Sequence, residues 1–180
     1  IFLFLSTWWS KHYNFTFDGI VYAVFVSLVF ATLENLMYVF QYGVGTGIIR
    51  ALTSVPGHTC FAVLMGYFYS KVRLAAKYKN IGGCLLNCAL ALAIPVLVHG
   101  LYDTIAMSGT LLSLFLFFIF VILMYVLGFL LVRKASKTDH LIIANMNMAS
   151  AAEGTWYCPR CGLYNHNNFC IRCGSPKPRL

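Results

Sequence analysis

Four apolar stretches of about 20 residues or more constrain the fold of this chain more than any other feature. They run from about Gly19 to Phe40, Ala51 to Ser70, Ile81 to Met107 and Leu111 to Val132. At 1.5 Å per residue, a helix of about 20 residues crosses a hydrocarbon core of about 30 Å. Lipid offers the backbone no hydrogen bonds, so each stretch must be helical. The sequence therefore predicts an all-α polytopic membrane protein with four full transmembrane helices.

The composition agrees with a membrane protein and excludes an ordinary soluble domain. Of 180 residues, 60% are hydrophobic and 10% are charged, whereas soluble domains carry about 25% charged residues. The opening segment, IFLFLSTWW, is interpreted as the end of a fifth apolar helix. Because the chain starts at Ile1 without a Met or a signal-peptide pattern, we expect that upstream helices are missing.

Basic residues cluster in alternate connections between the apolar stretches. One side of the membrane receives three clusters: Lys11; Lys71, Arg73, Lys77 and Lys79; and Arg133, Lys134 and Lys137. The connections on the other side, QYGVGTGIIR and SGT, hold only Arg50. Because basic loops stay in the cytoplasm, the C-terminal tail is predicted to be cytoplasmic. Nucleic acid, the other partner that a net charge of +8 suggests, is not expected.

The sequence divides into a membrane domain (residues 1–137), a mixed linker (138–155) and a Cys-rich module (156–180). The module carries two CxxC pairs, and its four thiols belong to Cys158, Cys161, Cys170 and Cys173. Four thiolates satisfy tetrahedral zinc, and a module this short cannot build an adequate core without a metal. The sequence therefore predicts a zinc ribbon that holds one structural Zn²⁺.

Three alternatives to this zinc site exist. Disulfides conflict with a cytoplasmic tail. A redox CxxC motif normally sits on a larger α/β scaffold, which this tail lacks. His166 could replace one Cys ligand, although a solvent-exposed position is the simpler interpretation.

Four ionisable residues lie inside the predicted spans: Glu34, His58, His99 and Asp103. Each costs roughly 2.5–3.5 kcal/mol on insertion scales, so such residues are functional candidates by default. Helical rise places them at similar depths in the outer half of the bilayer, on three different helices. His99 and Asp103 are four residues apart and share a helix face, and Pro95 lies one turn earlier.

Imidazole and carboxylate groups are zinc ligands, and a carboxylate near a zinc-bound water can act as a general base. These residues could therefore hydrolyse a peptide inside a membrane with a second, catalytic Zn²⁺. A buried polar network that joins helices or moves protons explains the same residues equally well. Neither histidine pair has the HExxH spacing, so spacing alone does not decide between them.

At these residues the chain resembles the PrsW family of intramembrane proteases, which is related to the CAAX-protease and bacteriocin-processing group. FATLEN matches the FxxxE motif of that family with Phe30 and Glu34. PGHTCF matches a motif built on His58, and HGLYD matches HxxxD with His99 and Asp103. The resemblance covers roughly residues 15–135. The tail resembles zinc-ribbon modules of prokaryotic membrane proteins, which implies a prokaryotic cell membrane.

The resemblance implies an endopeptidase, of metallo- or glutamic type, that cuts a membrane-anchored protein near the outer face of the membrane. An anti-sigma-type regulator is the kind of substrate that it suggests. Glu34, His58, His99 and Asp103 would line the site. The family's EExxK motif does not occur in this sequence and is expected upstream, so this piece alone is expected to be inactive.

Two other functions compete with the protease. One is a non-catalytic membrane scaffold whose cytoplasmic zinc ribbon docks a partner. The other is a proton-coupled transporter, which five helices without a visible inverted repeat support poorly.

Overall fold

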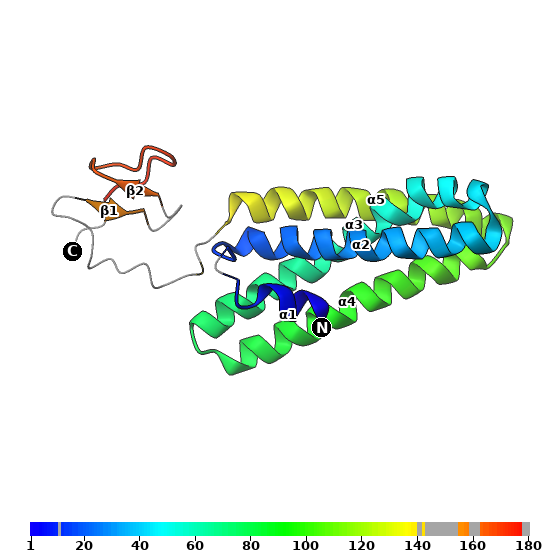
Figure 1. Ribbon diagram of the computed structural model, residues 1–180, viewed down its shortest axis with the longest axis horizontal. Helices are drawn as coiled ribbons and strands as arrows, with labels where there is room; N and C mark the ends of the chain where they lie inside the picture. Colours follow the sequence, from blue (N-terminus) through cyan, green and yellow to red (C-terminus); the bar gives the residue numbers. More distant parts are fainter. Residues whose placement is uncertain (11, 140–141, 143–154, 159–162, 178–180) are drawn as a thin grey trace.

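The structure, a computed structural model, describes residues 1–10, 12–139, 142, 155–158 and 163–177 (Figure 1). Its elements are α1 (Phe2–Thr7), α2 (Thr16–Tyr42), α3 (Val44–Lys77), α4 (Ile81–Met107), α5 (Leu111–Lys137), β1 (Trp156–Tyr157) and β2 (Tyr164–Asn165). Within the described residues, α2 to α5 are each long and apolar enough to cross a membrane. The chain is therefore a mostly helical, integral membrane protein.

Helix α3 is the centre of the helical bundle. It packs most extensively against α2 and α4 and also contacts α5, and it crosses behind α2 in the view of Figure 1. The turn from α2 to α3 and the turn from α4 to α5 lie at the same end of the bundle, which we call the connecting end. The opposite end, which we call the basic end, carries the basic clusters near the end of α3 and the end of α5.

The predicted spans agree with the helices, but one predicted connection is wrong. The third stretch matches α4 at both ends, and α5 continues from the fourth stretch to Lys137. Residues 41–50 were expected to form a loop, yet only Gly43 separates α2 from α3. Gly43 has a φ of 86°, a conformation that glycine adopts without a Cβ penalty. One residue therefore reverses the chain, and Arg50 lies inside a helix.

Contacts between the segment before α2, the start of α2, the end of α3 and the residues after α5 close the basic end of the bundle. Tyr13 is fully buried, and its hydroxyl donates to the Ser70 hydroxyl (3.4 Å). This burial raises the pKa of Tyr13 above its ordinary value. The Arg73 guanidinium lies 4.6 Å from the centre of the Tyr13 ring. After α5, Asp139 Oδ1 accepts the Phe17 N–H (2.9 Å), which ties the end of α5 to the start of α2.

The described part of the tail forms a small antiparallel pair of strands. Trp156 pairs with Asn165, and Tyr157 pairs with Tyr164. The buried Trp156, Cys158 and Cys170 form a cluster of their own. Lys11, Cys161 and most of the linker at 138–155 lie outside the described residues.

Candidate functional site

Three of the predicted site residues converge from three helices. Glu34 comes from α2, His58 from α3 and His99 from α4, and one side-chain ligand atom of each lies within 4.8 Å of the other two. His58 Nε2 and Glu34 Oε2 are hydrogen-bonded at 2.9 Å. The ring centres of His58 and His99 are 5.0 Å apart. The side chain of His58 is buried, and that of Glu34 is 23% exposed.

Asp103, the fourth predicted residue, lies at the edge of this cluster. Its Oδ2 is 3.6 Å from His99 Nε2, a distance that suits an electrostatic contact rather than a direct hydrogen bond. Its side chain is 51% exposed, whereas that of His99 is 33% exposed. The structure thus places Asp103 beside His99 and open to the surroundings.

The packing around His58 fixes the direction of its ring. Phe30 and Phe61 approach the ring edge-to-face, with centroids at 5.6 and 5.8 Å. The Ser27 hydroxyl of α2 donates to the His58 carbonyl at 3.0 Å. These contacts leave the imidazole little freedom to rotate away from Glu34.

A proline two residues before His58 interrupts the hydrogen bonds of α3. Pro56 has no N–H to donate to the carbonyl of Leu52, four residues earlier. The Tyr125 hydroxyl of α5 donates to that carbonyl instead, at 3.4 Å. The replacement bond links α5 to the turn of α3 that precedes His58.

Sequence reasoning missed one charged member of the site, Arg50. Its Nη2 donates to Glu34 Oε2 at 2.7 Å, and its guanidinium lies 3.6 Å from the centre of the Tyr38 ring. The prediction that residues 41–50 form a loop had placed Arg50 outside the membrane. One signal could have found it: Arg50 is the only Lys or Arg between Lys11 and Lys71, and Glu34 is the only acidic residue between Asp18 and Asp103.

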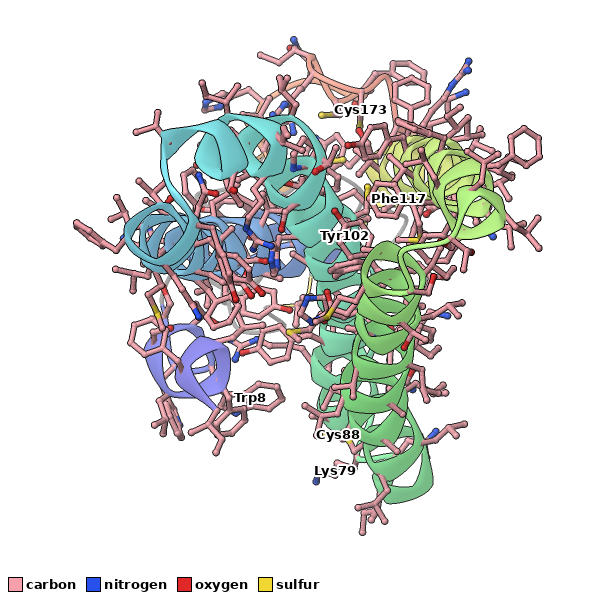
Figure 2. All side chains as sticks on the ribbon, turned by 90° about the vertical axis from the view of Figure 1, so that its right-hand side faces the viewer. Trp8, Lys79, Cys88, Tyr102, Phe117 and Cys173 are labelled. Atoms are coloured by element: carbon pink, nitrogen blue, oxygen red, sulfur yellow. The ribbon has the colours of Figure 1, made fainter. Side chains whose placement is uncertain are left out.

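One cavity borders the cluster, and a larger one is lined by its neighbours Arg50 and Asp103. The larger, about 660 Å³, opens near the connecting end and is lined by Arg50 and Asp103 together with hydroxyl-bearing and apolar side chains of α2 to α5. The smaller, about 320 Å³, is mostly apolar and is lined by His58 and His99. Figure 2 looks onto the connecting end, with Tyr102 and Phe117 near its centre; their ring centroids are 5.0 Å apart.

The residues of the cluster fit a bound metal ion. Two imidazoles and one carboxylate are among the ligands that proteins use for zinc, and a catalytic site with three such ligands leaves a position for water. The three groups reach one point from separate helices, as a metal site within a bundle requires.

The tail holds a second convergence of ligand atoms. The sulfurs of Cys158, Cys170 and Cys173 lie within 4.8 Å of one another, and those of Cys158 and Cys173 are 3.4 Å apart. His166 is exposed, and its ring contacts Tyr164 at 5.1 Å between centroids.

Comparisons with known proteins identify the family of the helical part. The model of the PrsW family of intramembrane metalloproteases matches residues 1–131. A Protease PrsW of Clostridioides difficile (strain 630) is 36% identical over 120 residues, which cover 64% of this chain and 49% of that protein. A Protease PrsW of Bacillus subtilis (strain 168) is 36% identical over 135 residues, which cover 75% of this chain and 58% of that protein.

The chain spans about half the length of these two curated relatives. No solved structure gives a significant match. The family match covers well over half of the chain and includes all four predicted residues of the membrane site. The chain therefore belongs to the PrsW family of intramembrane metalloproteases.

Proposed function

We propose that this chain forms the catalytic helices of an endopeptidase that cuts a membrane-anchored protein near the outer face of the membrane. One observation carries the proposal: Glu34, His58 and His99 converge on one point from three apolar helices. Family membership supports the reaction class. An anti-sigma-type membrane regulator is the substrate class that we propose.

In this proposal Glu34, His58 and His99 hold a catalytic zinc ion. When bound, zinc supplies a Lewis acid that polarises the scissile carbonyl and activates a water molecule. The aromatic contacts of His58 hold its ring in a fixed direction toward the ligand cluster. Asp103 orients His99 from the edge of the larger cavity, which admits the peptide and water.

We also propose that the tail is a zinc ribbon on the cytoplasmic side, attached to the membrane domain (residues 1–137) by the linker at 138–155. Cys158, Cys161, Cys170 and Cys173 would hold its Zn²⁺. The convergence of three of these sulfurs supports this role.

A cleavage assay tests the membrane site. In the full-length protein, Glu34→Ala, His58→Ala and His99→Ala should each reduce cleavage of a membrane-anchored reporter to background, because each removes one of three converging ligands. The assay uses reconstituted protein, normalised to the amount that is folded. Arg133→Ala, an exposed change on α5, is the control and should retain full activity.

A scaffold or a buried polar network predicts a different pattern. The same three substitutions would then lower expression or stability and leave the activity of each folded molecule unchanged. Full specific activity of His99→Ala would contradict the protease site as described.

A further inference from the structure

Arg50 makes a direct charged contact with the Glu34–His58–His99 cluster. Its Nη2 is 2.7 Å from Glu34 Oε2, and its side chain is 17% exposed. The face of its guanidinium stacks on Tyr38, at 3.6 Å from the ring centre. The ion pair and the stacking contact hold the planar group from two directions, so its position is fixed more tightly than that of a surface arginine.

Both hydrogen bonds recorded for the Glu34 carboxylate end on the same oxygen. Oε2 accepts from Arg50 Nη2 and is also hydrogen-bonded to His58 Nε2. A carboxylate has two oxygens with about four acceptor positions. One oxygen can therefore stay with Arg50 while the carboxylate remains a ligand for an ion between Glu34 and the two histidines.

The two partners of the Glu34 carboxylate lie on one helix. Arg50 comes from α3, the same helix as His58, two turns closer to its start. The contact with Arg50 therefore fixes the Glu34 carboxylate relative to His58, which lies on the same helix as Arg50.

We infer that Arg50 is a positioning residue for the metal site: it holds the Glu34 carboxylate toward His58 and His99, and Tyr38 holds Arg50. This inference rests on the metal site of the proposed function. If Arg50 instead competed with the ion for the carboxylate, replacing Arg50 would raise the metal affinity and not lower it. Partners of this kind, which contact a ligand and not the metal, typically alter metal affinity about 10–100-fold.

Metal affinity is the direct test. The full-length protein is stripped of metal and titrated with Co²⁺, whose visible absorption reports ligation by nitrogen and oxygen. The four tail cysteines are replaced by Ser throughout (Cys158→Ser, Cys161→Ser, Cys170→Ser and Cys173→Ser), so that the tail does not contribute a thiolate signal. We expect Arg50→Ala to weaken Co²⁺ binding about 10–100-fold. Tyr38→Leu should weaken it less, because the ion pair itself survives.

Two further variants make the result specific to the guanidinium. Arg50→Lys keeps the charge but lacks the planar fork and should bind Co²⁺ with an affinity between that of Arg50→Ala and the unsubstituted protein. Arg133→Ala removes an exposed arginine from α5 and should leave the affinity unchanged. If Arg50→Ala does not fold, Arg50→Lys carries the test, and an unchanged affinity in it overturns the inference.

The remaining outcomes separate this inference from the proposed function. Equal or tighter Co²⁺ binding by folded Arg50→Ala, with a site that His99→Ala still removes, overturns the positioning role alone. Absence of the Co²⁺ spectrum in the protein with Arg50 intact overturns both the metal site and the role of Arg50.

Discussion

Asp103 differs from the other site residues in its surroundings. Its side chain is half exposed and lines the larger cavity, whereas His58 is buried between aromatic rings. The 3.6 Å from its Oδ2 to His99 Nε2 makes it a neighbour of His99 rather than a member of the group in which Glu34, His58 and His99 converge. We therefore propose that Asp103 positions His99 and contributes less to activity than each of the three converging groups.

Asp103→Asn should lower cleavage about 10–100-fold without abolishing it, because the amide keeps the shape of the side chain but loses its charge toward His99. The measurement is kcat/KM on a membrane-anchored reporter, beside His99→Ala as the inactive reference. A loss as complete as that of His99→Ala would instead make Asp103 an indispensable member of the site.

Among individual residues, the sequence predicted the acidic residues and histidines of the candidate site but not Arg50. Glu34, His58, His99 and Asp103 stand out because ionisable groups are costly in lipid. Arg50 did not stand out, because it fell in the predicted loop at residues 41–50, where a charged side chain is expected to be exposed to water. The contact between Arg50 and Glu34 depends on where α3 begins, and single-sequence reasoning locates helix ends poorly.

The crossing of α2 and α3 depends on a close approach of two helix backbones. A Cβ at Gly66 would lie 2.5 Å from the Ile20 Cα and 2.6 Å from the Gly19 carbonyl oxygen. Backbone atoms cannot move aside as a flexible side chain can. Small residues at such crossings allow transmembrane helices to pack closely.

Gly66→Ala should therefore destabilise the helical bundle by about 1–3 kcal/mol, the usual cost of overpacking a close contact. Thermal unfolding in detergent micelles measures the change. Gly45→Ala is the matched control on the same helix, because a Cβ there has nothing within 4 Å. If Gly66→Ala lowers the stability no more than Gly45→Ala does, the close approach at Gly66 does not limit the packing of α2 and α3.

The elements themselves were predictable to different degrees. Ile81–Met107 was predicted with the observed bounds, because Asn80 precedes a long apolar run that ends in Ser, Gly and Thr. The start of α3 was not, because the three glycines in GVGTG suggested a loop. In the structure, only Gly43 has the positive φ of a turn, and Gly45 and Gly47 continue the helix.

The distribution of charge over the whole molecule predicts its orientation. The end of α3 carries Lys71, Arg73 and Lys77, and the end of α5 carries Arg133, Lys134 and Lys137, so both basic clusters lie at one end of the bundle. The positive-inside tendency then places the basic end in the cytoplasm and the connecting end outside. The candidate site would lie in the outer half of the membrane.

Cysteine labelling checks this orientation in intact cells. In a background without native thiols, Gly45→Cys should react with a membrane-impermeant maleimide from outside, and Lys77→Cys should react only after the cells are lysed. A cysteine at Asp139, just after α5, should behave like that at position 77. Labelling of position 77 in intact cells would reverse the assigned orientation.

The length of α3 has a consequence for the supply of water. Its 34 residues rise about 51 Å at 1.5 Å per residue, whereas the hydrocarbon core measures about 30 Å. With Lys71 at the cytoplasmic boundary, about 30 Å of helix reaches back to Arg50, and the turns before Arg50 stand in the headgroup region. The Arg50–Glu34 pair then lies at the hydrated boundary of the bilayer. In the proposed orientation, a hydrolytic site in this position would draw its water from the adjacent outer solution and would not need a channel through the whole membrane.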